Sequence, residues 1–203
     1  MRVIFLGKKP SSVEALELLV KNGVEVVAAV APPNEQESHW SPKLSDACRA
    51  LGVPLAASEE LYQCIADPAH PPRPELAGCA DNIDFVISFL FWERIKKPLI
   101  DLPRRGCINF HPAPLPDFRG VGGYNVAIAE NLPQWGVSAH FVEERFDTGA
   151  VIAVDRFPIS PERETALSLE QKSQQKLLAL FRRVMDDAAA GKDLARAPQA
   201  EGR

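Results

Sequence analysis

Short apolar runs alternate with amphipathic segments along this chain, and this alternation constrains its fold more than any other feature. Arg2–Leu6 is an apolar run suited to a central parallel strand, and residues 11–23 follow with helical periodicity. In that helix we expect Ser11 as the N-cap, Glu14 as the second half of a capping box and an end at Gly23. The same patterns predict strands at 24–31, 53–57, 84–91, 107–111, 137–144 and 150–159, and helices at 41–51, 123–131 and 165–191. The sequence therefore predicts an α/β fold, with an open, mainly parallel twisted sheet and helices on both faces.

Polar side chains stand at the end of the predicted strand at 107–111. Because side chains two residues apart in a strand point to the same face, Asn109 and His111 should lie side by side. The prolines that follow end the strand, since proline supplies no N–H to a sheet. Ligands of open α/β sheets bind beyond the carboxyl ends of the strands. The two side chains are therefore candidates for catalysis, although a polar rim that satisfies the next loop has the same pattern.

Asp147 is the third polar candidate, in the turn that the letters FDTG predict. Aspartate favours turns through hydrogen bonds to its own backbone, and Gly149 supplies flexibility there, so a purely structural turn also fits the pattern. A carboxylate near an imidazole raises its basicity and fixes its orientation, while a side-chain amide donates to a developing oxyanion. If Asn109, His111 and Asp147 meet, they suit acyl transfer to an amine.

Composition narrows the classes of protein to which the chain could belong. Its 203 residues, 46% hydrophobic and 25% charged, are those of an ordinary globular protein, so we expect one domain at 1–191 and a disordered tail at 192–203. A net charge of −4 argues against a dedicated polyanion binder. The four cysteines are scattered without a CxxC pair, which argues against a zinc site and against a disulfide scaffold. The apolar run at the start is too short for a signal peptide or a membrane span, so we expect a cytoplasmic protein with no membrane partner.

Two segments of the chain resemble the signature of the folate-dependent formyltransferases. They are INFHPAPLPDFRG at 108–120 and GVSAHFVEERFDTGAVI at 136–152. The similarity extends from the first strand to about Ile159 and is densest between Ile108 and Ile152. The family includes glycinamide ribonucleotide, methionyl-tRNA and sugar N-formyltransferases, and the resemblance implies their Rossmann-like fold. It also implies that 10-formyltetrahydrofolate donates a formyl group to a primary amine, as of an amino sugar nucleotide, an amino acid derivative or a ribonucleotide amine.

The resemblance also implies roles for individual residues, beginning with Asn109, His111 and Asp147 as the catalytic set. The family's pterin pocket corresponds here to Leu90, Phe91, Trp92, Ile95, Val142, Glu143, Glu144 and Phe146. The residues implied for the amine substrate are Lys8, Lys9, Ser11, Ser12, Arg119 and His140. The first four precede or open a helix, where backbone N–H groups and lysine ammoniums attract a phosphate or carboxylate. An ordinary turn with solvated lysines, and a strand histidine with a structural partner, are the plain alternatives.

Departures from the family pattern bear on the substrate. APLP stands at 113–116 where the family often has Ser-Leu-Leu-Pro, and VGGYNVAIAEN follows Gly120. The loop at 32–40 contains Glu35 and Glu37 and no lysine or arginine, whereas tRNA formyltransferases have a longer, basic loop there, so we expect no nucleic-acid partner. Two other functions remain open, namely hydrolysis of 10-formyltetrahydrofolate and folate or nucleotide binding without catalysis.

Overall fold

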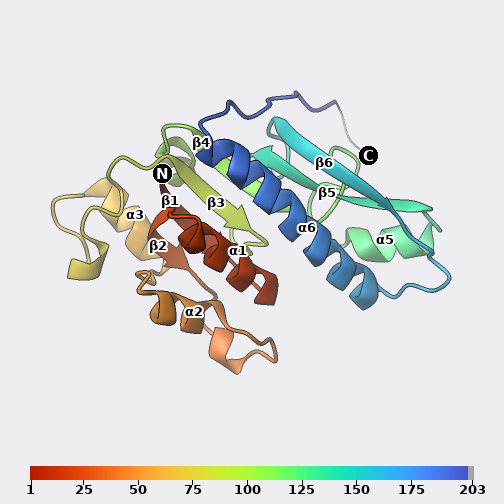
Figure 1. Ribbon diagram of the computed structural model, residues 1–203, viewed down its shortest axis with the longest axis horizontal. Helices are drawn as coiled ribbons and strands as arrows, with labels where there is room; N and C mark the ends of the chain where they lie inside the picture. Colours follow the sequence, from red (N-terminus) through yellow and green to blue (C-terminus); the bar gives the residue numbers. More distant parts are fainter. Residues whose placement is uncertain (201–203) are drawn as a thin grey trace. The chain divides into compact units, whose positions relative to one another are not determined.

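The six strands within residues 1–200 belong to one sheet. The computed structural model describes residues 1–200 and contains two compact units, residues 1–108 and residues from 109 onward. The strand order is β2-β1-β3-β4-β5-β6. β1 is parallel to β2 and to β3, whereas β5 and β6 are antiparallel. The predicted α/β fold with an open, mainly parallel sheet is therefore confirmed (Figure 1).

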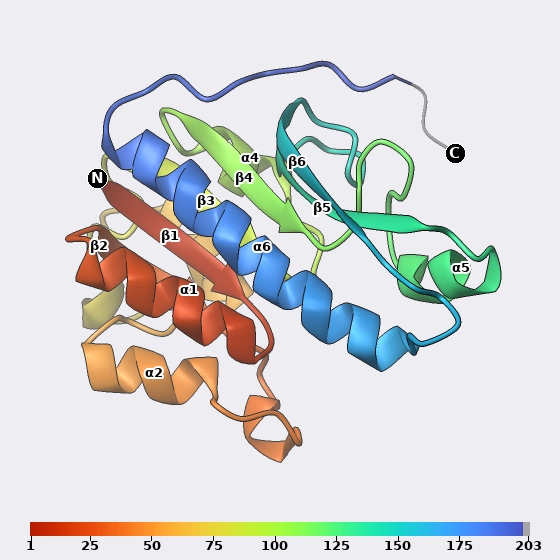
Figure 2. The same cartoon turned by 45° about the vertical axis from the view of Figure 1, so that its right-hand side comes forward.

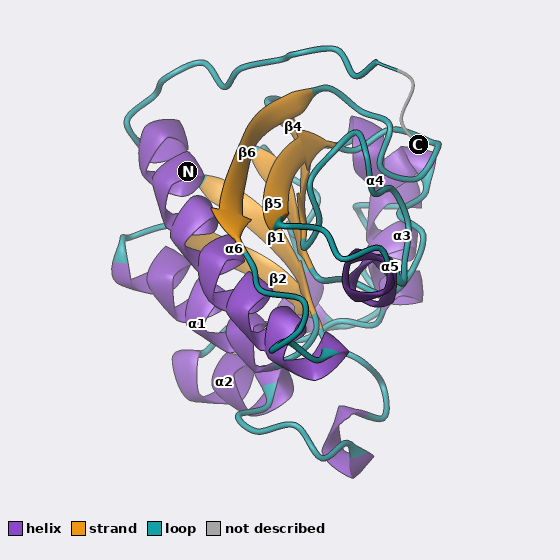
Figure 3. Cartoon of the chain, turned by 90° about the vertical axis from the view of Figure 1, so that its right-hand side faces the viewer, coloured by secondary structure: helices purple, strands orange, loops and turns teal. Residues whose placement is uncertain are grey.

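In the first unit, helices cover both sides of the strands. Its elements are β1 (Arg2–Gly7), α1 (Pro10–Lys21), β2 (Glu25–Val30), the 3₁₀ helix η1 (Glu35–Glu37), α2 (Leu44–Leu51), α3 (Ser58–Ala66), the 3₁₀ helix η2 (Pro74–Leu76), β3 (Phe85–Phe89) and α4 (Lys97–Asp101), and β4 (Gly106–His111) crosses into the second unit. α1 lies along β1, and α2 packs against α1 (Figure 2). Figure 3 shows α1 on one side of these strands and α3 on the other. The apolar residues of these strands, among them Phe5 of β1 and Phe89 of β3, are buried between the two layers of helices.

The start of α1 differs from the sequence prediction. The helix begins at Pro10 and its N-cap is Lys9, so Ser11 lies inside the first turn and no side chain accepts a capping hydrogen bond. Proline suits this position because the N–H that it lacks would have no partner in the helix. Ser12 donates its hydroxyl hydrogen to the Lys9 carbonyl oxygen at 2.7 Å.

The start of α2 also differs, because a side chain distant in the sequence caps it. The prediction was a start at Ser41, and the helix instead begins at Leu44. The buried carboxylate of Glu35 accepts hydrogen bonds from the backbone N–H groups of Leu44 and Ser45 at 2.8 and 2.9 Å. Glu35 is therefore a structural residue and does not make the surface of the 32–40 loop acidic.

Two other segments of the first unit differ from the prediction. The expected weak strand at 53–57 is reduced to one isolated bridge between Ala29 and Leu55. Helices α3 and α4 were not predicted. In α3, Leu61 and Cys64 are three residues apart and both buried, which is a helical spacing too short to stand out among the loops around it.

The second unit is built around an antiparallel pair of strands. After β4 it contains α5 (Gly123–Ala129), β5 (Gln134–Phe141), β6 (Val151–Pro158) and α6 (Ala166–Ala189), and α6 packs against β5, β6 and α5. Phe110 on β4 and Phe181 on α6 meet edge to face, with ring centroids 4.9 Å apart. No helix in the described part of the chain is long and apolar enough to cross a membrane.

The segment after α6 is ordered by backbone pairing, in contrast to the tail that we predicted. Residues 190–200 run as an extended trace (Figure 2), and Ala197 exchanges two hydrogen bonds with Val151 of β6, at 2.8 and 3.0 Å. Composition alone predicts disorder here because the segment has no periodic apolar pattern, whereas a strand edge pairs with any backbone. The last three residues of the predicted tail, 201–203, lie outside the described residues.

Candidate active site

The turn between β5 and β6 holds the predicted aspartate in an uncommon backbone conformation. Asp147 has a φ of 53°, in the left-handed region that aspartate tolerates better than most residues. Gly149 lies so close to the end of β5 that a Cβ atom there would be 1.9 Å from the carbonyl oxygen of Phe141. The turn needs Gly149 for this close approach, and not for flexibility as the sequence suggested.

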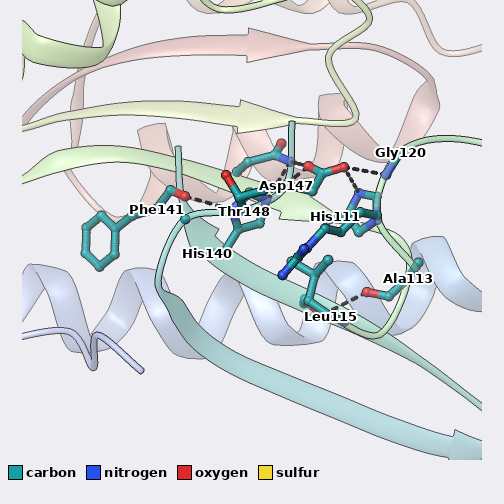
Figure 4. Close-up of polar contacts among 12 residues, drawn as sticks. His111, Ala113, Leu115, Gly120, His140, Phe141, Asp147 and Thr148 are labelled. Atoms are coloured by element: carbon teal, nitrogen blue, oxygen red, sulfur yellow. Dashed lines mark hydrogen bonds and ion pairs between the residues drawn. The ribbon is translucent and has the colours of Figure 1, made fainter. Parts of the chain in front are cut away.

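The Asp147 carboxylate is surrounded by nitrogen atoms of the second unit (Figure 4). Oδ1 lies 3.3 Å from His140 Nε2 and 3.4 Å from Asn109 Nδ2. Oδ2 accepts a hydrogen bond from the backbone N–H of Gly120 at 2.8 Å and lies 3.6 Å from His111 Nδ1. The structure therefore brings Asn109, His111 and Asp147 into one cluster. It also adds His140, which the resemblance implied for the substrate, and the backbone N–H of Gly120, for which the sequence has no signal.

His111 is buried at the end of β4, with 6% of its surface exposed. Its Nε2 lies 2.8 Å from the carbonyl oxygen of Phe118, so Nε2 carries a hydrogen and donates it. Burial lowers the pKa of His111 below its ordinary value of 6.5, although the charge of Asp147 and the Phe118 carbonyl act in the opposite direction. In the neutral ring Nδ1 is therefore unprotonated, and a proton accepted there would lie beside the Asp147 carboxylate.

His140 is buried on β5 and belongs to the same cluster. Its Nδ1 lies 2.7 Å from the carbonyl oxygen of Phe141, to which it donates, and its Nε2 lies 3.1 Å from Asn109 Nδ2. Nε2 therefore accepts from the Asn109 amide when the ring is neutral. The resemblance implied substrate contact for His140, and in the structure the ring contacts two of the catalytic candidates, so it orients the Asn109 amide.

The surroundings of Asp147 keep its carboxyl group ionised. Burial alone would raise its pKa. A hydrogen bond from His140 Nε2 and the positive charge of His111, each present when that ring is protonated, together with the Gly120 N–H, outweigh burial and lower the pKa from 3.8 to about 2. Across residues 1–200, no group of three or more His, Cys, Asp and Glu side chains is arranged to hold a metal ion. The cluster therefore combines a fixed negative charge, a buried imidazole and an oriented amide, which together suit proton transfer beside a developing oxyanion.

Arg119 is engaged by the segment that follows α6. Its Nε and Nη2 donate to Gln199 Oε1 at 3.1 and 2.9 Å, and Nη2 also donates to the Ala200 carbonyl oxygen at 2.9 Å. Sequence reasoning assigned Arg119 to the substrate and assigned no role to Gln199, because a frayed tail offers no signal.

The residues expected to bind the pterin come from both units. In the first unit, Leu90 has a positive φ of 57°, Phe91 and Trp92 have ring centroids 4.4 Å apart, and Ile95 is buried. In the second unit, Val142 is half-buried and Glu143, Glu144 and Phe146 are exposed.

Of the residues expected to bind an anion, the two lysines lie near the ring of Trp40, to which the sequence analysis assigned no role. Lys8 Nζ and Lys9 Nζ lie 5.2 and 5.5 Å from the centroid of Trp40, whereas Ser11 and Ser12 are buried in the first turn of α1. Burial and the neighbouring charge of Lys8 lower the pKa of Lys9. Two ammonium groups thus lie near one indole ring.

Comparisons with known proteins identify relatives of this chain. The sequence profile of the family described as Formyl transferase matches residues 1–185. A curated relative, the methionyl-tRNA formyltransferase of Myxococcus xanthus (strain DK1622), is 31% identical over 175 residues, which cover 84% of this chain and 53% of the relative. The chain spans about half the length of the curated relatives it matches.

Solved structures of several formyltransferases have the same fold. The N-formyltransferase from Helicobacter canadensis, in complex with folinic acid and dTDP-3-aminofucose, has a TM-score of 0.76 and 20% identity, over 98% of this chain and 67% of that chain. The phosphoribosylglycinamide formyltransferase from Bacillus halodurans has a TM-score of 0.68 and 23% identity, over 93% of this chain and 97% of that chain. These likenesses show the fold, and the profile match shows the family. The chain therefore belongs to the Formyl transferase family.

Proposed function

We propose that this chain is an N-formyltransferase that moves a formyl group from 10-formyltetrahydrofolate to a primary amine of a small molecule. The observation that carries the proposal is the ionised Asp147 carboxylate, which lies beside His111 and the Asn109 amide in a chain of the Formyl transferase family. We assign the activity to residues 1–191. We also propose a cytoplasmic setting, which agrees with four cysteine thiols that are buried and not disulfide-bonded.

The proposed roles follow from the charges that formyl transfer develops. 10-Formyltetrahydrofolate supplies the formyl group: a bond forms from the amine nitrogen to the formyl carbon, and the bond from that carbon to the folate nitrogen breaks. Negative charge develops on the formyl oxygen, and Asn109 donates to it with the Nδ2 hydrogen whose bond to Asp147 is long, at 3.4 Å. One positioned donor of this kind contributes roughly 3 kcal/mol of transition-state stabilisation.

His111 handles the proton in this proposal. The attacking amine loses a proton, and Nδ1 of His111 accepts it at 3.6 Å from the Asp147 carboxylate, which stabilises the resulting positive charge. The same proton then passes to the folate nitrogen as it leaves. The lowered pKa of His111 supports this role because the ring is neutral, and able to accept, near pH 7.

In this proposal the donor contacts the residues implied for the pterin pocket, and each unit contributes its own set. Half-buried aromatic side chains at Phe91 and Trp92, and the exposed ring of Phe146, suit a flat heterocycle, while the turn at Leu90 offers backbone groups that read its polar edge. The Helicobacter canadensis relative was crystallised with folinic acid, which supports a folate as the donor here.

The acceptor in this proposal is a small amine with a phosphate or carboxylate group. We assign the binding of that anion to Lys8, Lys9, Ser11 and Ser12 at the start of α1, and we keep Arg119 and His140 of the second unit as acceptor-binding candidates. Two ammonium groups on one indole support this assignment, since an anion relieves the repulsion between them. Replacing Lys8 and Lys9 by alanine should raise the KM of the acceptor and leave folate binding intact, while Lys21→Ala at the exposed end of α1 serves as the control. An unchanged KM in the double variant would remove the anion site from the proposal.

Transfer is distinguished from the other functions by a screen of candidate amines with 10-formyltetrahydrofolate. Release of tetrahydrofolate together with a formylated amine, detected by mass, supports the proposal, whereas release with formate and no amine product indicates a hydrolase. His111→Ala should retain folate-analogue binding and lose most turnover. Binding of the analogue with no turnover in the wild type would indicate a non-catalytic folate protein.

We further propose that initiator methionyl-tRNA is not the acceptor, in contrast to the curated relatives. The exposed part of the loop at 32–40 contributes Glu37 and no lysine or arginine, and phosphate-backbone binding needs clustered positive charge. The measurement is binding at two salt concentrations together with a formylation assay. A micromolar complex that weakens with salt, or formylation of the tRNA, would contradict this part.

A further inference from the structure

The segment Arg196–Ala200, which we call the strap, runs beside β6 in the second unit. Ala197 pairs with Val151 through two backbone hydrogen bonds, and the guanidinium of Arg196 lies 3.6 Å from the ring centroid of Phe141. The strap lies beyond residue 185, where the match to the family profile ends. The family match therefore assigns no role to the strap, and its contacts must be considered by themselves.

One side chain of the strap uses its complete hydrogen-bonding capacity on the active-site turns. Gln199 Nε2 donates to the carbonyl oxygens of Asp147 and Gly149, at 2.9 and 2.7 Å. Gln199 Oε1 accepts from Nε and Nη2 of Arg119, at 3.1 and 2.9 Å. A glutamine amide offers two donors and two acceptor positions, so every one of them is occupied.

These four bonds join the two pieces of backbone that determine where the Asp147 carboxylate lies. One piece is the 147–149 turn, in which Asp147 adopts the left-handed conformation that an L-residue does not favour by itself. The other piece is Arg119–Gly120, and the Gly120 N–H donates to Asp147 Oδ2 at 2.8 Å. Gln199 thus holds the main chain of the aspartate and, through Arg119, the N–H that binds its side chain.

We propose that Gln199 is a positioning residue for Asp147, and that the strap completes the active site of this chain. This inference rests on the proposed role of Asp147 in formyl transfer. Loss of the Gln199 amide leaves two carbonyl oxygens and the Arg119 guanidinium without these bonds, and it lets the carboxylate move away from His111 Nδ1.

The test compares Gln199→Ala with Gln175→Ala, an exposed glutamine of α6, in the full chain. Without substrate, hydrogen exchange of the Gly120 amide is measured by NMR, because Gly120 is exposed and its N–H is protected by Asp147. We expect exchange at Gly120 to be roughly 10-fold faster or more in Gln199→Ala and unchanged in Gln175→Ala, since opening of a local hydrogen bond is what exchange reports. This measurement does not depend on activity, so it remains decisive even where the wild type transfers no formyl group and the proposed function fails.

With donor and acceptor present, Gln199→Ala should lower kcat roughly 10- to 100-fold, the effect expected of a displacement of about 1 Å, with the KM of the donor unchanged. Gln199→Glu keeps an acceptor for Arg119 but removes both donors to the turn, so it should lower kcat as well. In an Asp147→Asn background, Gln199→Ala should cause little further loss, because its effect passes through the carboxylate. Unchanged exchange at Gly120, an unchanged kcat, or losses that multiply in the double variant would each overturn the proposal.

Discussion

Replacement of Gly149 by alanine tests how tightly the Asp147 turn is held against β5. The new Cβ atom would lie 1.9 Å from the carbonyl oxygen of Phe141 and 2.8 Å from its carbonyl carbon. Both neighbours are backbone atoms, so no side-chain rotation relieves the contact. The turn must therefore move by about 1.5 Å before the new methyl group reaches ordinary van der Waals contact.

The size of the effect follows from that displacement. Overpacking of this kind costs about 1–3 kcal/mol of unfolding free energy, which for a chain of this length lowers Tm by roughly 2–12 °C. Asp147 lies two residues from the substitution and would move with the turn. A displacement of about 1 Å in catalytic geometry costs roughly 100-fold in rate, so kcat should fall by about that factor.

Thermal unfolding and the formyl-transfer assay measure the two effects, and Gly23→Ala is the matched control. Gly23 ends α1 with a φ of 73° and has no atom within 4 Å of the position of a Cβ. Alanine there should cost about 1 kcal/mol through backbone conformation and leave kcat unchanged. The argument fails if Gly149→Ala unfolds at the wild-type temperature with wild-type kcat, or if Gly23→Ala loses as much activity.

Three further predictions concern stability. The folded-state pKa of His111 lies below 6.5, so the unfolded chain binds more protons and the wild type should lose stability as pH falls below 6.5. His111→Gln should remove that part of the pH dependence, measured by urea unfolding at pH 8 and pH 5. An equal loss of stability between these pH values in the two proteins would contradict the prediction. The pKa of Asp147 falls from 3.8 to about 2 on folding, so its contribution of about 2 kcal/mol to stability is present above pH 3.8 and is lost towards pH 2. Asp147→Asn should reduce the loss of stability between these pH values. An unchanged loss in the variant would show that other carboxylates cause it. Glu35→Ala should destabilise the protein by about 1–2 kcal/mol because α2 loses its cap, whereas the control Glu37→Ala should change stability by less than about 0.5 kcal/mol. Equal effects of the two variants in chemical denaturation would exclude the capping role of Glu35.

Local pattern was sufficient for the parts of the fold whose cause is local. Apolar runs of strand length and long amphipathic repeats predict β1, β2, β3, β4 and α6, because burial of one face depends on residues close in sequence. The same holds for Asn109 and His111, which a strand places on one face two residues apart, at the end where ligands of such sheets bind.

The sequence pattern did not predict features that depend on backbone contacts or on residues distant in the sequence. The start of α2 depends on Glu35 from an earlier loop, and the orientation of the His140 ring depends on the carbonyl of Phe141 and on Asn109 from another strand. Gly149 looks like any turn glycine in the sequence, and only its distance to Phe141 shows that a close approach requires it.

The sequence by itself determined the α/β fold, the family signature and the side chains able to perform acyl transfer. Tertiary structure brings Asp147 close to His111, places His140 against the Asn109 amide, and joins the segment after α6 to the 147–149 turn through Gln199. The physical reason is one of range. Secondary structure and side-chain chemistry are properties of neighbouring residues. In contrast, pKa values, tautomers and the position of a carboxylate also depend on groups far away along the chain, as in the contacts Asn109 to His140 (31 residues apart) and Asp147 to Gln199 (52 residues apart).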